Sequence, residues 1–374
     1  MSRFFAIFPV LLLALYGNLP AMATDREEHP RTEIVPEPAI VSHIALMLPL
    51  ESPAFAEAAN VVKEGFVTAT QRGQALSLPV RIYATTGDPL DILIGYHHAV
   101  SAGAAFVVGP LTRDGVSAIA SSQSLEVPVL ALNTVDNNQT LPAKLYLFGL
   151  QTETEADQIA KLAQSSNDRN HAIVIGDDGS LSKRLQNAFM QQWQHQAGNT
   201  AELIRYTDNP ELLQHLRSLT EASNQLVFLA LDAAQSRIVR AFLAPETPVY
   251  ATSQIFTGSG NFLLNSDLNG IQFVDMPWLL QPDHPAVMAY RHGSTARSAD
   301  MERLYALGID AFRLMANLLL PQPVDAISID GVTGNIRFAT PGLFIREPVA
   351  AQFEQGQVKL LNTTQKDIAE HEGQ

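Results

Sequence analysis

The chain of 374 residues contains no cysteine. Disulfide bonds, thiolate metal ligands, thiol catalysis and lipid attachment through an amino-terminal cysteine are therefore excluded for this sequence. Basic residues are also scarce, because 24 lysine and arginine residues stand against 38 aspartate and glutamate residues. A chain this acidic is not expected to attract nucleic acid or an anionic membrane surface by electrostatics.

Long apolar runs are absent except near the start of the sequence. Phe4 to Tyr16 is almost wholly apolar, and Ala21-Met22-Ala23 places small residues where a signal peptidase reads them. Because the run is shorter than the roughly 20 residues that a membrane span needs, we predict that residues 1–23 are a cleaved signal peptide. The mature chain is then expected to be soluble and exported, with no transmembrane span. Cleavage removes one arginine, so its net charge is 23 minus 38, or −15.

The rest of the chain alternates short buried strands with amphipathic helices. Phe106 to Val108 and Val127 to Leu132 are apolar runs typical of strands buried on both faces, and Thr112 or Asp114 can cap a helix between them. Strand, helix and strand make a right-handed βαβ unit. The alternation occurs in two series, which predicts an α/β fold with two doubly wound, Rossmann-like lobes joined by crossing strands.

The two series and the tail predict a division of the chain. The expected parts are a flexible leader (24–39), lobe 1 (40–147 with 275–322), lobe 2 (148–274 with 323–362) and a disordered tail (363–374). Ile271 to Met276 is expected to be the strand that returns to lobe 1. A long buried helix is predicted from the apolar stripe between Leu304 and Leu318. Two hairpins should follow, one around Gly331 to Gly334 and one around Gly356.

Ligands in such sheets bind outside the carboxyl ends of the strands, where four of the five candidate cleft residues lie. Thr112, Asn133 and Thr134 follow predicted strands and can offer polar groups to a carboxylate. Glu51 can meet a cation, and Tyr305 projects from the side of the long helix as a lobe-surface or cleft aromatic. Helix capping, turn formation and solvation are the alternative roles. For Asp310, also on the long helix, an ion pair with Arg313 or Arg303 is the preferred interpretation.

Catalytic and metal-binding patterns are weak. Ser180 and Lys183 have the Ser-x-x-Lys spacing of penicillin-recognising acyl enzymes, but the Lys-Thr-Gly and Ser-Asp-Asn elements of that chemistry are missing. Ser180 is better interpreted as a helix N-cap. His97 and His98 are adjacent and therefore diverge by about 100° on a helix, which is poor geometry for a shared metal. We expect no catalytic residue, no metal and no cofactor.

Several segments resemble the type I periplasmic binding protein fold, as in leucine/isoleucine/valine-binding proteins. They are Ile44 to Leu50, Val107 to Leu111, Val127 to Leu130 and Leu304 to Ala311. Within that fold the chain is similar to the carboxyl-terminal domain of the penicillin-binding-protein activator family (the LpoA/LppC type). That similarity is carried by Gly109 to Arg113, Ala131 to Asn133 and Tyr305 to Ala311. The resemblance covers roughly residues 42–362.

The resemblance implies a periplasmic, non-enzymatic regulator of peptidoglycan synthesis that binds a class A penicillin-binding protein directly, with a small ligand in the cleft left open. The alternative is a solute receptor of an ABC transporter that closes on a branched-chain amino acid or a similar small ligand. Two departures matter. Those activators usually carry a lipidated cysteine and an amino-terminal helical-repeat domain, whereas this sequence has no cysteine and only a short leader at 24–39. Either a trimmed, soluble version or a different role would account for them.

Overall fold

A computed structural model describes residues 41–73, 76–135, 140–258, 260, 262–291, 297–340 and 342–361. All of them belong to the second of two compact units, Ile40–Gln374. The predicted signal peptide (1–23), leader (24–39) and tail (363–374) lie outside the described residues. None of the helices in the described ranges combines the length and the apolar character that crossing a bilayer requires.

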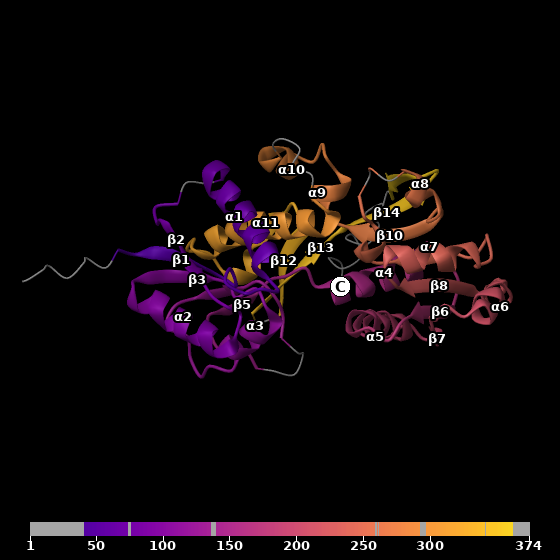
Figure 1. Cartoon of the computed structure of the whole chain (residues 1–374), viewed down its shortest axis with the longest axis horizontal. Coiled ribbons are helices and arrows are strands. Elements are labelled where there is room, and N and C mark those ends of the chain that lie inside the picture. The colour runs from indigo at the N-terminus through magenta and orange to yellow at the C-terminus, as the bar shows by residue number, and fades with distance from the viewer. Residues whose placement is uncertain are drawn as a thin grey trace, which may run out of the picture. The chain divides into compact units, whose positions relative to one another are not determined.

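The described chain up to Asp275 contains two βα series (Figure 1). The first comprises β1 (His43–Leu48), α1 (Ala56–Arg72), β2 (Val80–Ala84), α2 (Pro89–Ser101), β3 (Ala104–Val108), α3 (Arg113–Ala120), β4 (Val129–Ala131) and β5 (Leu145–Leu147). The second comprises α4 (Thr152–Ser166), β6 (His171–Gly176), α5 (Ser180–Gln194), β7 (Thr200–Arg205), α6 (Pro210–Thr220), β8 (Gln225–Ala230), α7 (Ala233–Ala241), β9 (Val249–Ala251), the 3₁₀ turn η1 (Ser253–Ile255), α8 (Phe262–Ser266) and β10 (Ile271–Asp275).

The remaining elements return to both series. They are α9 (Pro277–Leu280), α10 (Pro285–Tyr290), α11 (Ala299–Leu318), the 3₁₀ turn η2 (Val324–Ala326), β11 (Ser328–Asp330), β12 (Asn335–Thr340), β13 (Leu343–Glu347), β14 (Val349–Glu354) and β15 (Gln357–Leu360). An eight-stranded sheet with the order β11-β12-β13-β5-β4-β3-β1-β2 forms lobe 1, and a seven-stranded sheet with the order β15-β14-β10-β9-β8-β6-β7 forms lobe 2.

Both sheets are covered by helices on both faces, as the fold prediction requires. In lobe 1 one apolar cluster packs the sheet against α1 and α11, and another packs it against α2 and α3. Lobe 2 likewise has separate clusters on its two faces. The strands β1 and β3–β5 pair in parallel, as do β6 with β7 and β8 with β9. The predicted architecture of two doubly wound lobes is confirmed.

Local signals explain where several helices begin. Thr112 is the N-cap of α3, and its Oγ1 accepts a hydrogen bond from Gly115 N at 3.3 Å, so one of the two predicted caps is confirmed. Asp88 caps α2, and Pro89 occupies the first helical position, where its missing N–H is tolerated. In α7, Asp232 and the third helical residue form a capping box.

The helices α1 and α11 cross at very short range. A Cβ added to Gly65 would lie 2.0 Å from Tyr305 O, and one added to Gly308 would lie 2.1 Å from Val62 O. Because a side chain at either position would collide with the opposing backbone, glycine permits this contact. The apolar stripe predicted between Leu304 and Leu318 is therefore part of α11, which packs on α1 as well as on the sheet.

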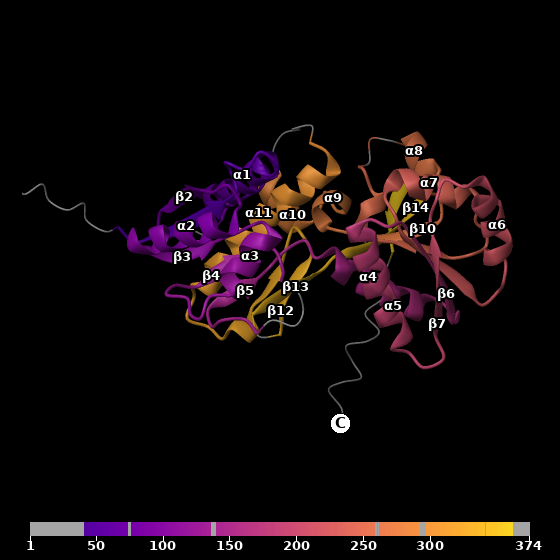
Figure 2. The ribbon, with the colours of Figure 1, turned by 60° about the horizontal axis from the view of Figure 1, so that its bottom comes forward.

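Two predicted sheet memberships are wrong. Ile271 to Met276 was expected in lobe 1, but β10 pairs with β9 and β14 in the lobe 2 sheet. The hairpin of β11 and β12 was expected in lobe 2 within 323–362, but it joins the lobe 1 sheet through β13, whose Leu343 pairs with Leu147 of β5. The sequence analysis missed β13, which is separated from β14 by Pro348 alone. Figure 2 shows the yellow ribbon passing from one lobe to the other there.

Candidate functional site

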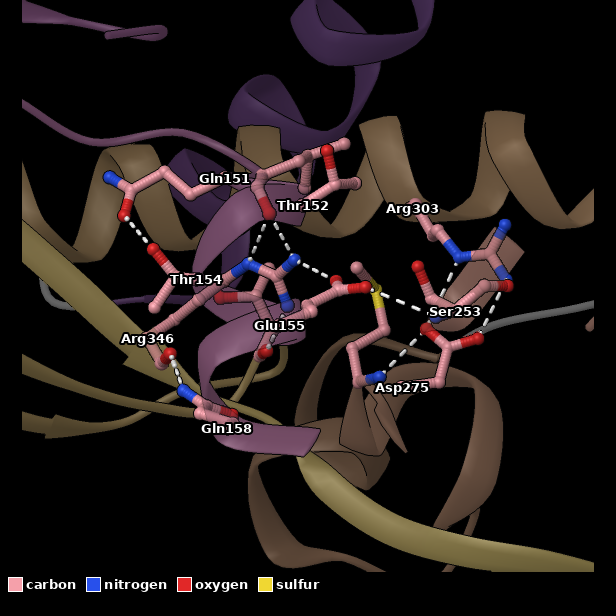
Figure 3. Close-up of polar contacts among 12 residues, drawn as sticks. Gln151, Thr152, Thr154, Glu155, Gln158, Ser253, Asp275, Arg303 and Arg346 are labelled. Carbon is pink, nitrogen blue, oxygen red and sulfur yellow. Dashed lines mark hydrogen bonds and ion pairs between the residues drawn. The ribbon is translucent and has the colours of Figure 1, made fainter. Parts of the chain in front are cut away.

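Three segments connect the lobes, and two buried arginine–carboxylate pairs lie where they meet (Figure 3). The described chain changes sheet after β5, after β10 and at Pro348 between β13 and β14. Glu155 is in the first turn of α4, Asp275 ends β10, Arg303 is on α11 and Arg346 is on β13. Each of these four charged residues therefore lies on a helix or strand next to one of the three connections between the lobes, which we call crossings. We call this group the hinge network.

The Arg346 guanidinium joins the first crossing to the third. Its Nη2 forms an ion pair with Glu155 Oε1, and its Nε donates a hydrogen bond to Leu150 O at 3.1 Å. Its Nη1 donates to Thr333 O at 3.3 Å. In return, Gln158 Nε2 of α4 donates to Arg346 O at 3.0 Å. The segment before α4 and the start of α4 are thereby bonded to β13 through both the side chain and the backbone carbonyl of Arg346.

Arg303 joins the second crossing to this pair. Its Nη2 lies 2.6 Å from Asp275 Oδ2, and its Nε lies 3.2 Å from Oδ1 of the same carboxylate. The same Nη2 donates to Ser253 O at 2.9 Å and to Phe256 O at 2.8 Å. Ser253 N in turn donates to Glu155 Oε2 at 3.1 Å. The peptide of Ser253 therefore links the two ion pairs into one continuous polar network.

Burial governs the electrostatics of the hinge network. Burial raises the pKa of the Glu155 carboxyl, against the opposing effect of Arg346. Burial alone would lower the pKa of Arg303, but the neighbouring Asp275 carboxylate raises it above its usual range. Removing one partner of such a pair leaves an uncompensated buried charge and typically costs about 3–5 kcal/mol. These charges bind one another, and their arrangement is suited to holding the lobes together.

A polar groove of about 740 Å³ lies beside the hinge network. Its lobe 2 wall consists of side chains spaced by three and four along two helices, which places them on one face of each helix. They are Thr154, Asp157, Gln158 and Lys161 of α4 and Arg184, Asn187, Ala188 and Gln191 of α5. Its lobe 1 wall includes Arg113, Thr134, Arg337 of β12 and alternate residues of β13 (Leu343, Ile345 and Glu347). The groove therefore has charges of both signs.

Glu153 spans this groove. Its Oε1 accepts a hydrogen bond from Arg184 Nε of lobe 2 at 2.6 Å and forms an ion pair with Arg113 Nη2 of lobe 1 at 3.2 Å. Partial burial alone would raise the pKa of Glu153, but a backbone hydrogen bond and the two guanidinium groups lower it. All three side chains keep about a third of their surface exposed. We call this three-residue contact the clasp.

The predicted residues at the strand ends lie near one another, but their polar groups contact the protein itself. Thr112 caps α3, and Asn133 Nδ2 donates a hydrogen bond to Leu111 O at 3.0 Å. Asn133 Oδ1 accepts from Thr134 N at 2.9 Å. Of these residues, Thr134 lines the groove. The geometry corresponds to the capping and turn roles that the sequence left as alternatives, and a ligand role for these residues stays a prediction.

Glu51 and Tyr305 lie away from the groove. Glu51 is exposed in the turn after β1, where its backbone N–H donates to Thr85 O at 3.0 Å. Tyr305 is buried between α11 and α1, and its hydroxyl donates to Thr68 Oγ1 at 2.8 Å. The Tyr305 ring also contacts the Trp278 ring, with the centroids 5.4 Å apart. Tyr305 thus contributes to helix packing in this structure.

The remaining sequence candidates have local partners. Gly179 is the N-cap of α5, one residue before the predicted Ser180, and Ser180 Oγ accepts from Arg184 Nη1 at 2.9 Å. Lys183 lies 3.6 Å from the Asp178 carboxylate. The predicted pair of Asp310 with Arg313 is present at 3.0 Å. Among the described residues, no three His, Asp or Glu side chains gather in a way that could hold a metal ion.

The sequence analysis did not single out Glu155, Asp275 or Arg346. A usable signal existed for Glu155 and Asp275, because each lies directly beside apolar residues that the structure buries. Glu155 precedes the buried Ala156, and Asp275 follows the buried Phe273 and Val274 of β10. A lone charge in such a pattern indicates a buried partner, although it does not identify that partner.

Two α/β lobes joined by three crossings define the type I periplasmic binding protein class. A solved structure described as a putative branched-chain amino acid ABC transporter from Chromobacterium violaceum matches with a TM-score of 0.71 and 36% identity, covering 83% of this chain and 99% of that one. The "LpoA (YraM) C-domain from Haemophilus influenzae, a regulator of PBP1A" matches with a TM-score of 0.73 and 24% identity, over 85% of this chain and 99% of that one.

The chain belongs to the LppC family. The family profile described as "LppC putative lipoprotein" matches residues 37–356. Relatives named penicillin-binding protein activator LpoA are 26% identical in Pectobacterium parmentieri, over 78% of this chain and 49% of that protein, and 27% identical in Haemophilus influenzae, over 85% and 55%. The resemblance found in the sequence segments is confirmed. The chain spans about half the length of these relatives.

Proposed function

We propose that this protein is an exported, non-enzymatic regulator of peptidoglycan synthesis that activates a class A penicillin-binding protein by direct binding. The observation that carries this proposal is the set of relatives named as penicillin-binding protein activators, which align with most of this chain. The proposed location is the periplasm, reached through the signal peptide predicted at residues 1–23. No cofactor is part of the proposed activity.

The local geometry around Ser180 supports a regulatory rather than a catalytic role. An acylating serine needs a base aligned with its hydroxyl. Here Ser180 Oγ accepts a hydrogen bond from the Arg184 guanidinium, and Lys183 is directed to Asp178. The charged groups of the hinge network are likewise paired with one another, and that pairing supports a structural role for them.

The test is a reconstituted polymerisation assay. Purified class A penicillin-binding protein from the same organism is supplied with lipid-linked disaccharide precursor, with and without the mature protein, and glycan strand synthesis is followed over time. We expect a rate increase that saturates with concentration and a complex detectable by crosslinking. A matched sample of a solute receptor of the same fold serves as the control. No complex and an unchanged rate would exclude the proposed function.

A second candidate is a solute receptor of an ABC transporter. It is favoured by the Chromobacterium violaceum structure, which is 36% identical and is matched along nearly its whole length. Against it, the polar groups of Thr112 and Asn133 that would meet an amino-acid carboxylate already bond to the backbone. Thermal-shift screening with the common amino acids separates the two. A ligand present at 100 times its dissociation constant should stabilise the protein by about 2.7 kcal/mol.

A further inference from the structure

The groove beside the hinge network contains two charged side chains that neither the hinge network nor the clasp uses. Asp157 and Lys161 of α4 line its lobe 2 wall, one helical turn apart. Asp157 is half-buried and Lys161 is exposed. Within the described ranges neither forms an ion pair or a side-chain hydrogen bond, whereas the other charged residues that line the groove are paired. We call these two residues the α4 charge pair.

Most other polar groups along the groove already have partners. On the lobe 1 wall, Arg337 Nε donates a hydrogen bond to Glu347 Oε1 at 2.8 Å. On α4, Thr154 Oγ1 donates to Gln151 Oε1 at 3.2 Å, and Gln158 is bonded to the backbone of β13 (Figure 3). The clasp accounts for the remaining charged groups. The α4 charge pair is therefore the charged part of the groove that is left for a ligand.

The surroundings of Asp157 favour a cationic partner. Partial burial raises the pKa of its carboxyl against the opposing effects of Lys161 and His195, and the nearby Glu153 charge raises it further. A carboxylate that is partly removed from water is stabilised by a neighbouring positive charge and by hydrogen bonds that it accepts. An ammonium group supplies both, because it carries a positive charge and three N–H donors. A carboxyl with such a raised pKa in a cavity indicates a binding site.

The neighbouring helix adds neutral polar groups to this wall. Asn187 and Gln191 are one turn apart on α5, and their exposed side chains line the groove. The helices α4 and α5 lie side by side in both ribbon views (Figures 1 and 2). Each amide offers both donors and an acceptor. Residues four apart on a helix have Cβ atoms about 5–6 Å apart, so Asp157 and Lys161 can contact one small group that bears both charges.

The facing wall is partly apolar. Leu343 and Ile345 alternate along β13, so their side chains lie on the same face of that strand. Val135 and Ala188 add further apolar surface to the groove. The groove measures about 740 Å³. Ligand sites of about 300–1,000 Å³ hold drug-sized molecules, so the groove is suited to a ligand larger than a single amino acid.

We propose that this groove binds a short peptide that carries an ammonium and a carboxylate on the same carbon, with the ammonium on Asp157 and the carboxylate on Lys161. The apolar part of the peptide packs on Leu343 and Ile345, and the amides of α5 bond to its backbone. The groove is lined mainly by the sides of α4, α5 and β13. It is therefore a different place from the carboxyl ends of the parallel strands, where ligands of such sheets are expected.

The position of the two charges restricts the class of ligand. An ordinary peptide of three or more residues carries its ammonium and its carboxylate at opposite ends. Two sources have both groups on one carbon, namely free amino acids and cell-wall peptides whose diamino acid leaves one amino-acid end free. The volume of the groove favours the peptide. This choice of source rests on the proposed function, because a regulator of peptidoglycan synthesis works where cell-wall peptides are present.

The first test is calorimetry of the mature protein with a matched pair of peptides. The probe is L-Ala-γ-D-Glu-meso-diaminopimelate, and the control is L-Ala-γ-D-Glu-L-Lys, which lacks the carboxylate on the carbon that bears the free ammonium. We expect the probe to bind about tenfold tighter or more, which corresponds to about 1.4 kcal/mol. Equal affinity for the two peptides, or no binding of the probe, would overturn the assignment. Free leucine or free diaminopimelate binding as tightly as the probe would also overturn it, since the ligand would then be a free amino acid.

The second test changes the α4 charge pair. Asp157→Asn should weaken binding of the diaminopimelate probe about tenfold or more. Lys161→Gln should lower the affinity for the probe to that for the lysine control and leave the affinity for the control unchanged. Asp168→Asn is the matched variant, because Asp168 is exposed beyond the end of α4 and does not line the groove, and its affinity should stay within about twofold of wild type. Circular dichroism and thermal melting verify that each variant is folded. Unchanged affinity in both Asp157→Asn and Lys161→Gln would show that the peptide binds elsewhere.

The reconstituted polymerisation assay, run on the same preparations, separates this assignment from the proposed function. Wild type that activates the synthase but binds none of these peptides overturns the groove assignment and leaves the proposed function standing. Binding of the probe to the α4 charge pair without activation of the synthase supports the groove assignment and excludes the proposed function.

Discussion

The two places where the lobes meet differ in how their charges are treated. In the hinge network, Glu155 and Arg346 are almost completely buried, and their remaining polar atoms bond to backbone groups on other elements. In the clasp, Glu153 meets Arg113 and Arg184 at similar distances, but all three side chains stay in contact with water. The same pair of chemical groups therefore serves two different purposes.

The two contacts differ because water reaches the clasp but does not reach the hinge network. A buried charge that loses its partner cannot be rescued by water, so the hinge network fixes the relation of the three crossings. An exposed pair contributes up to about 1 kcal/mol and can be replaced by hydration. The lobes are consequently joined tightly at the crossings and only weakly across the groove. Opening of the groove should therefore be controlled at Glu153, with the crossings acting as a fixed pivot.

The largest effect is expected from breaking the hinge network. Arg346→Met leaves the Glu155 carboxylate buried without its cation and should lower the free energy of unfolding by about 3–5 kcal/mol. Urea denaturation followed by circular dichroism measures it. Adding Glu155→Gln to this variant removes the uncompensated charge, so the double variant should be more stable than the single one. A double variant that is less stable than Arg346→Met would show that the two residues act independently.

The sequence predicted local features of the fold well and long-range ones poorly. The cap at Thr112 and the apolar stripe of α11 depend on residues three or four positions apart, and both are present. Membership of a sheet depends on partners far along the chain. β13 therefore escaped notice, and β11 and β12 were assigned to the wrong lobe. Nothing in the segment around Pro348 records which sheet each side of it joins.

In the candidate site, too, contacts between residues far apart in the sequence were the ones that the sequence did not predict. Arg303 was considered as a partner for Asp310, seven residues away on the same helix, whereas the structure pairs it with Asp275, 28 positions away on β10. Thr134 was selected because strand ends face the groove, and it lines the groove. Tyr305 was selected by its angle on the helix. That angle could not reveal that α1 covers it.

A smaller effect is expected from removing the clasp. Glu153→Gln keeps the shape of the side chain but removes the charge that faces both guanidinium groups, and should destabilise the protein by about 0.5–1 kcal/mol. The lobes should separate more often. Since the chain has no cysteine, Ile94→Cys and Leu203→Cys give one label on each lobe without background labelling, and energy transfer between them reports the separation. Glu354→Gln, which disrupts an ion pair within the β14–β15 hairpin, should leave the separation unchanged.

The smallest effect is the pH dependence of the clasp. Because the pKa of Glu153 in the folded protein is lowered from its usual 4.5, the ionised carboxylate stabilises the closed contact at pH values above 4.5. That stabilisation should disappear as the pH falls below 4.5 through the lowered pKa, because protonation removes the charge. The difference in stability and in label separation between wild type and Glu153→Gln should therefore be constant from pH 7 to pH 5 and shrink toward zero below that range. A difference that persists at pH 3 would mean that Glu153 acts through its shape and its neutral hydrogen bonds, in which case the contrast between a fixed hinge and an adjustable clasp would not rest on charge.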